Sequence, residues 1–274
     1  MHKTLLEQGL EVSQNTVAKL MKQAGIRARN TPKFRPATTD SAHNLRVAPN
    51  RLEQRFFAAC PNQVWLTDFT YLPIADGFSY LATVQDLCSR RIVGWSASRT
   101  IDAQLALAAL AQAIALRQPK PGLIVHSDRG SQYASHLFRD RLQQHGFLQS
   151  MSRQGNCYDN APMESFFKSF KVEEVYHSNY ETHGQAVRAV TDYIDRFYNP
   201  VRLHSALGYT SPNQYEQKRL YLNKAQPEIC LRRSHSSVAR QALATDNGNK
   251  EADFQTAFVG EFRASKLTIA LPNP

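Results

Sequence analysis

The sequence predicts an α/β fold in which helices cover the faces of a mixed β-sheet. Three observations support this prediction. Residues 63–96 contain three consecutive segments rich in β-branched and aromatic side chains. Helical and strand-like patterns then alternate as far as residue 198. The resulting order is three strands, then helix, strand, helix, strand and helix, which is typical of a mixed five-stranded sheet with helices on its faces.

The first three strands are predicted to form an antiparallel meander. Residues 63–72 carry β-forming side chains on both faces, and Ala75-Asp76-Gly77 is typical of a turn. Residues 79–88 and 91–96 continue with short apolar runs. Closely spaced strands joined by short turns pair most simply with their neighbours in sequence.

The next elements alternate between helix and strand. Residues 102–117 are rich in Ala and Leu and predict a helix that ends before two prolines. Residues 122–126 form a short apolar run, which is typical of a buried parallel strand. The remaining predicted elements are a helix at 135–145, a strand at 147–151, a loop at 152–156, a helix from Ala161 and a helix at 184–198. We place this body at residues 58–216.

Two short helices are predicted before the body, at residues 1–8 and 14–24, with Ser13 suited to cap the second. Such a pair is compatible with a partial helix-turn-helix segment over residues 1–28. It is equally compatible with a small amphipathic pair that packs on the body. The candidate DNA contacts on the second helix are Asn15, Thr16 and Lys19.

Composition separates two further segments from the body. Residues 29–57 are basic and proline-containing without helical or strand periodicity, which predicts a linker. This linker either tracks a DNA backbone or is a solvated tether. Residues 217–274 have a broken pattern and contain no motif, so we expect an atypical tail without stable order.

The charge balance favours a polyanionic partner. The chain has 274 residues, with 33 Lys and Arg against 23 Asp and Glu, a formal net charge of +10. Neither a long apolar span nor a secretory signal is present in the sequence, so we expect a soluble intracellular protein. Four scattered cysteines without a Cys-x-x-Cys pair argue against a zinc knuckle and a disulfide framework, and free thiols are expected.

Three carboxylates are the candidate catalytic residues: Asp68, Asp128 and Glu164. Asp68 lies within a strand, where a buried carboxylate requires compensation from a cation or metal. Asp128 follows an apolar strand, at the kind of strand end where active-site groups collect. Carboxylate oxygens suit Mg²⁺, and a two-metal site on a basic chain indicates phosphoryl transfer on nucleic acid.

Glu164 lies on a predicted helix with two different faces. At about 100° per residue, Glu164, Lys168 and Lys171 share one arc, whereas three phenylalanines share another. For Glu164 alone, an ordinary solvated Glu–Lys pair is the favoured interpretation. Taken together with the two aspartates, it completes a metal-binding set, and the two lysines would hold substrate phosphates.

Long motifs in the chain resemble a known family, the OrfB-type transposases of bacterial insertion sequences, which carry a retroviral-integrase-like (DDE) catalytic core. The resemblance covers roughly residues 1–216. The matching motifs are Pro61 to Tyr71, Asp86 to Trp95, His126 to Tyr133, Ser152 to Phe167, Tyr198 to Tyr209 and Ser211-Pro212.

The resemblance implies an RNase H-like fold with Asp68, Asp128 and Glu164 as the DDE residues. It implies Mg²⁺-dependent cleavage and joining of DNA at the terminal inverted repeats of an insertion sequence, with Mn²⁺ as an expected substitute. The position of Lys171 matches a basic residue that contacts DNA in the family. Further candidate DNA contacts are Arg129, Arg202 and His204.

The resemblance also carries expectations about partners and alternatives. Self-association on paired DNA ends is expected. The family's front helix-turn-helix usually begins further upstream, so we expect the chain to start inside it and to work with a partner protein encoded in an upstream frame. Two alternatives stay open: an RNase H-like nuclease that cuts without joining, and a truncated DNA-binding regulator of transposition.

Overall fold

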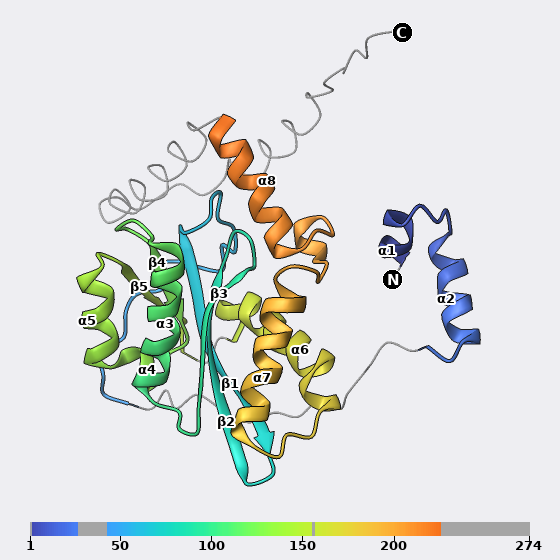
Figure 1. The fold of residues 1–274 in the computed structure, drawn as a ribbon. Coiled ribbons are helices and arrows are strands. Elements are labelled where there is room, and N and C mark those ends of the chain that lie inside the picture. The colour runs from blue at the N-terminus through green and yellow to red at the C-terminus, as the bar shows by residue number, and fades with distance from the viewer. Residues whose placement is uncertain (1, 27–42, 155–156, 226–274) are drawn as a thin grey trace. The chain divides into compact units, whose positions relative to one another are not determined.

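Five strands of the computed structural model form one mixed sheet, ordered β3-β2-β1-β4-β5 (Figure 1). The structure describes residues 2–26, 43–154 and 157–225. The strands are β1 (Val64–Ile74), β2 (Gly77–Asp86), β3 (Ile92–Ser98), β4 (Ile124–Ser127) and β5 (Leu148–Met151). The first three pair antiparallel, whereas β4 is parallel to both β1 and β5. The predicted mixed five-stranded sheet of an RNase H-like fold is therefore confirmed.

Helices cover both faces of this sheet. The helices are α1 (His2–Glu7), α2 (Gln14–Gln23), α3 (Ala103–Arg117), α4 (Ser131–Ala134), α5 (His136–Gln144), α6 (Ala161–Glu173), α7 (His183–Thr191) and α8 (Pro212–Ala225). Figure 1 shows α3, α4 and α5 on one side of the sheet, and α6 and α7 on the other. Each side has its own apolar core, because side chains alternate along β1: Trp65 and Phe69 face α3, whereas Leu66 and Leu72 face α6 and α7.

The structure refines the predicted elements at several ends. The helix predicted at 135–145 is preceded by a separate turn, α4, because Ser135 has an extended backbone and its hydroxyl caps α5. The chain continues from α7 as a π-helix over Asp192–Tyr198. Helix α8 was not predicted, and it crosses the expected boundary at residue 216. The rest of the expected tail, from residue 226, lies outside the described residues.

The two N-terminal helices form as predicted. Ser13 caps α2, and its hydroxyl accepts a hydrogen bond from the Thr16 N–H at 3.1 Å. Gly25 ends the segment with a left-handed backbone, φ +69°. Along α2 only Val17 is buried.

Part of the expected linker is packed on the core. His43 Nε2 lies 2.7 Å from the carbonyl oxygen of Arg129. The Arg51 N–H donates to the hydroxyl of Ser150 on β5 at 2.8 Å. Residues 43–57 are therefore not a solvated tether, whereas residues 29–42 of the expected linker lie outside the described residues.

The expectation of free thiols is wrong at one position. Cys88 is a free, buried thiol, but Cys60 is disulfide-bonded. Sequence spacing could not reveal this, because the pairing depends on which segments the fold brings together.

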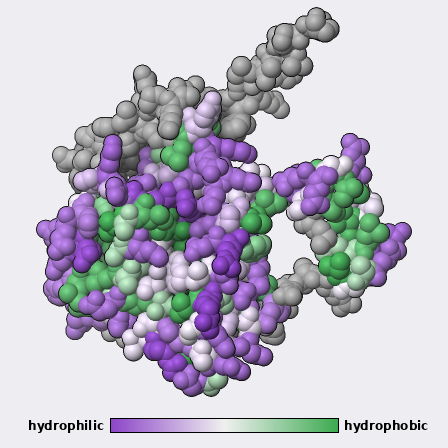
Figure 2. All heavy atoms as spheres, viewed as in Figure 1, coloured by the Kyte–Doolittle hydropathy of each residue, from purple (hydrophilic) through white to green (hydrophobic). Residues whose placement is uncertain are grey.

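The visible face of the molecule mixes hydrophilic and hydrophobic side chains, including apolar ones over α3 and α5 (Figure 2). Leu116 of α3 and Leu137 of α5 are exposed. Among the described helices, none combines the length and apolarity that crossing a membrane requires.

Candidate active site

The sheet places Asp68 and Asp128 side by side. The last parallel pair between β1 and β4 is Leu66 with His126. Asp68 lies two residues further along β1, on the face of Leu66 that α6 and α7 cover, and Asp128 directly follows the end of β4. The charge of Asp128 acts on the Asp68 carboxyl, so the two carboxylates are close neighbours.

The electrostatics of Asp68 reflect this arrangement. Burial raises the pKa of its carboxyl well above the ordinary value, and the nearby charge of Asp128 raises it further. Glu164 acts in the same direction, whereas the Phe69 N–H, which donates at 2.8 Å, and the ammonium of Lys171 lower the pKa. The charges of Asp128 and Glu164 therefore both act on Asp68 in the folded chain.

Two further contacts fix the strand ends. Asp128 directly follows β4, and the Gly130 N–H donates to its Oδ1 at 2.9 Å. The buried hydroxyl of Tyr133 lies 3.1 Å from Thr67 Oγ1, and the pKa of Tyr133 is raised by burial and then by both aspartates. These contacts favour a single arrangement of the two carboxylates.

Helix α6 presents Glu164 as the sequence predicted. Pro162 occupies its first turn, where a missing N–H costs nothing. The phenylalanine face is buried in the core. Glu164 and Lys168 lie on the exposed surface of the helix. Asn160 directly precedes the helix but makes no side-chain cap bond, and its amide instead reaches the Thr67 carbonyl at 3.5 Å.

Lys171 points from α6 toward the end of β1. Its ammonium lies 4.6 Å from the ring centroid of Tyr71, a cation–π contact. Burial lowers the pKa of Lys171, and the charge of Asp68 raises it. The structure therefore places this predicted DNA contact beside the acids.

The other predicted DNA contacts lie elsewhere. Asn15, Thr16 and Lys19 are exposed on α2, separated from the core by residues outside the described ranges. Arg129 follows Asp128, and its Nε donates to the Ser152 carbonyl at 2.6 Å.

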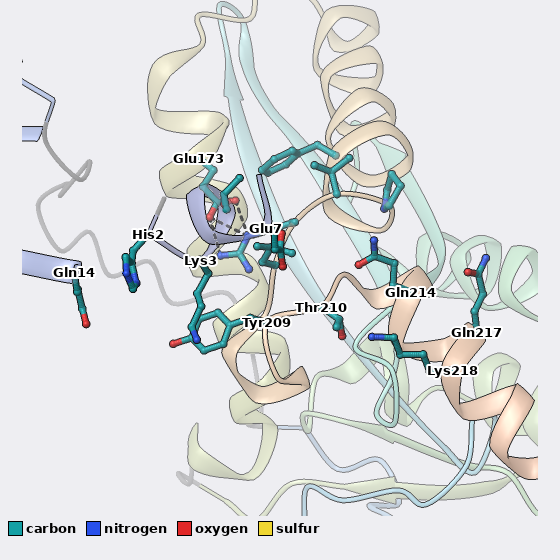
Figure 3. A pocket seen from close by; sticks show the side chains of 16 residues that line it. His2, Lys3, Glu7, Gln14, Glu173, Tyr209, Thr210, Gln214, Gln217 and Lys218 are labelled. Carbon is teal, nitrogen blue, oxygen red and sulfur yellow. Dashed lines mark hydrogen bonds and ion pairs between the residues drawn. The ribbon is translucent and has the colours of Figure 1, made fainter. Parts of the chain in front are cut away.

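Arg202 forms an ion pair within the protein. Its Nη2 lies 2.7 Å from Glu173 Oε1, and it also donates to Ser169 at 3.0 Å; Figure 3 shows Glu173 and this pair at close range. His204 lies against the ring of Tyr198, with centroids 4.9 Å apart, and burial lowers the pKa of His204 to about 4. Both side chains therefore have structural roles within the protein.

The sequence reasoning missed Asp159 and His126. Asp159 is fully buried and accepts from Arg153 at 2.7–3.0 Å. His126 is also fully buried, and burial lowers its pKa to about 4. Both lie inside the matching motifs, next to predicted acids, but no pattern in the chain marks which polar residues are buried.

The donor set fits a hard divalent cation. Two half-buried aspartates lie together here, and the charge of Asp128 raises the pKa of Asp68, so a bound cation would relieve their repulsion; oxygen ligands are those that Mg²⁺ prefers. Within the described ranges, no three His, Cys, Asp or Glu side chains are gathered closely enough to hold a metal ion by themselves. Glu164, which is exposed at the edge of the site, would have to approach the aspartates to complete the set.

Comparisons with known proteins identify the family of the chain. Two models described as "Integrase core domain" match residues 58–157 and 164–220. The chain is 44% identical over 216 residues to the transposase InsF for insertion sequence IS3A of Escherichia coli K12, covering 79% of this chain and 75% of that protein. It is 42% identical over 216 residues to the transposase for insertion sequence element IS904 of Lactococcus lactis, covering 78% and 85%.

A solved structure resembles the chain more distantly. The catalytic core domain of HTLV-2 integrase in complex with magnesium is 16% identical, with a TM-score of 0.44, and the match covers 57% of this chain and 97% of that domain. The family assignment therefore rests on the sequence matches, which span most of the length of both aligned proteins. The chain belongs to the IS3-type family of insertion-sequence transposases with an integrase core domain.

Proposed function

We propose that the chain is a DDE transposase that cleaves DNA at the ends of an insertion sequence and joins the freed ends to target DNA. Its catalytic and metal-binding residues would be Asp68, Asp128 and Glu164. The observation that best supports this proposal is the parallel register of β1 and β4, which brings the end of β4, directly before Asp128, beside the part of β1 that carries Asp68. The kinship with transposases gives the reaction class.

Divalent cations, Mg²⁺ or Mn²⁺, would be held by the three carboxylates. When bound, they would activate the attacking hydroxyl and stabilise the leaving 3′-oxygen. The aspartates must be ionised to hold them, so the raised pKa of Asp68 keeps the site weak until cation and DNA arrive together.

Basic side chains around the acids would hold the DNA. Lys168 and Lys171 lie on the same helix as Glu164 and would contact phosphates beside the reacting bond. Arg129, Arg202 and His204 would support the DNA or the site, and α2 would contribute Asn15, Thr16 and Lys19. A basic chain of net charge +10 attracts DNA at long range.

The reaction implies further partners. Terminal inverted repeats and target DNA are the substrates. Two ends must meet for joining, which implies self-association on DNA, and a partner from an upstream frame would add end recognition. The place of action would be the bacterial nucleoid in the cytoplasm.

The test uses labelled DNA ends taken from beside the gene, with Mg²⁺ or Mn²⁺. We expect metal-dependent nicking and joining in the unmodified protein, and neither in Asp128→Asn. Asp76→Asn is the matched control, because Asp76 is an exposed acid that is paired with Arg99 and is not one of the three proposed ligands.

The outcomes separate the alternatives. Nicking without joining would favour the nuclease. DNA binding without any reaction would favour a regulator. Equal activity in Asp128→Asn and the unmodified protein would overturn the assignment of the acids.

A further inference from the structure

Asp159 is a buried carboxylate that the proposed catalysis does not use. Its side chain is fully buried, yet five N–H groups point to it. Three come from Arg153: its backbone N at 2.7 Å, Nε at 3.0 Å and Nη2 at 2.9 Å. Asn50 Nδ2 at 3.0 Å and Gln54 Nε2 at 2.9 Å complete the set. The Arg153 contacts hold the pKa of Asp159 well below its usual range, so the carboxylate is charged and fixed in position.

The same turn touches both strands that carry catalytic acids. His126 Nε2 lies 2.9 Å from the carbonyl oxygen of Asp159. The amide of Asn160 reaches the carbonyl oxygen of Thr67 at 3.5 Å. His126 lies two residues before the acid on β4, and Thr67 lies directly before the acid on β1. The turn Cys157–Asn160 leads without a break into α6, which carries the third acid.

The hydrogen bonds of His126 fix its tautomer. A carbonyl oxygen can only accept, so Nε2 carries the proton. In a neutral ring that is protonated at Nε2, Nδ1 can only accept, so the hydroxyl of Ser150, 2.8 Å away, donates to it. The same hydroxyl accepts from the Arg51 N–H at 2.8 Å. Every polar atom of the buried ring thus has a partner, and the ring forms a rigid link between β4, β5 and the turn.

We infer that Asp159 and His126 are positioning residues that set Glu164 against the two aspartates. The inference rests on the proposed function, because it assigns how that site is assembled. Two hydrogen-bonded links to neighbouring strands and five donors to one carboxylate leave the start of α6 little freedom. Removing a group that hydrogen-bonds to a metal-binding residue and orients it typically lowers activity or metal affinity by about 10- to 100-fold.

The test compares Asp159→Asn and Arg153→Gln with Arg99→Gln. Arg99 forms the same kind of ion pair with Asp76, and it serves as the matched control. Arg153→Gln is the milder change, because the Arg153 side chain is 55% exposed. It tests the positioning role if Asp159→Asn does not fold. One measurement is the Mn²⁺-dependent cleavage of end DNA, separated into kcat and KM. The other is hydrogen exchange of residues 161–170 without metal or DNA.

We expect kcat to fall about 10- to 100-fold in Asp159→Asn and less in Arg153→Gln, with KM nearly constant. Exchange over 161–170 should become faster in both, and Arg99→Gln should match the unmodified protein. His126→Gln, whose amide can still donate to the Asp159 carbonyl, should retain more activity than His126→Leu.

Unchanged kcat and unchanged exchange would overturn the inference and leave the proposed function standing. A loss confined to KM would also overturn it, since that pattern indicates a direct contact with DNA. By contrast, an Asp128→Asn variant as active as the unmodified protein would remove the proposed function itself, while the exchange measurement would still report whether Asp159 fixes α6.

Discussion

Gly94 marks the closest approach between the sheet and a helix, and its replacement by alanine is the sharpest test of the fold. Gly94 lies in β3 against α3. An alanine Cβ there would lie 2.3 Å from the Ala109 carbonyl oxygen, 2.7 Å from the Ala113 nitrogen and 2.8 Å from the Ala113 Cβ. Two of these three atoms belong to the helix backbone, which no side-chain rotation can move away.

The size of the effect follows from these distances. An ordinary contact between carbon and oxygen is about 3.3 Å or longer, so α3 would have to move by roughly 1 Å. That shift would disturb the packing of Leu105 and Leu110, which are buried on the sheet-facing side of α3. Overpacking costs about 1–3 kcal/mol and occasionally more. With a rigid backbone as the obstacle, we expect a loss of about 3 kcal/mol in the free energy of unfolding of Gly94→Ala.

Urea unfolding of the metal-free protein measures this loss. Since the urea dependence is about 1–3 kcal/mol per M, the midpoint should fall by about 1–3 M with an unchanged slope. Gly184→Ala is the matched control: Gly184 lies in α7, and its added Cβ would meet only Thr182 Oγ1 at 3.9 Å. The control should keep or gain stability, by up to about 1 kcal/mol. A loss below about 1 kcal/mol in Gly94→Ala would refute the reasoning.

Three further predictions concern the site and its support. Because burial and Asp128 raise the pKa of Asp68, the rate of DNA cleavage should increase with pH through that raised pKa. A higher Mg²⁺ concentration should move this increase to lower pH, because the cation competes with the proton. A pH–rate profile that does not change with Mg²⁺ concentration would contradict this prediction. Glu216→Gln should lower the free energy of unfolding in urea by about 3–5 kcal/mol, because Arg117 and Arg91 would stay at least partly buried without their counter-charge. A loss under about 1 kcal/mol would disprove the stabilising role of these ion pairs. Tyr71→Leu should weaken binding of end DNA about 2- to 30-fold in fluorescence anisotropy, because Lys171 loses its contact with the ring. Tyr71→Phe keeps the ring and should bind normally. Equal losses of affinity in the two variants would exclude a role for the cation–π contact.

The sequence carried the order of elements and indicated three candidate acids. Runs of β-branched and aromatic residues mark β1 and its neighbours, and the period of α6 separates its phenylalanine face from Glu164. These features are local, because they depend on the period of a strand or helix. Long motifs added the family, which the comparisons confirm.

Contacts between distant segments were beyond the sequence. Nothing in the pattern marks Asp159 as buried or Gly94 as touching α3, because each depends on an atom supplied by another element. Helix α8 was missed because its apolar residues do not form a clear stripe, and it is held instead by Glu216, which pairs with Arg117 and Arg91.

The sequence by itself thus indicated which side chains are candidates for the chemistry and determined which elements carry them. The tertiary structure alone decided how these elements meet: the parallel register that brings the end of β4 beside β1, and the turn at Asp159 that joins the start of α6 to both strands. The physical reason is that periodicity records only which face of an element is buried. Register and docking are set by hydrogen bonds and close packing between residues far apart in the chain.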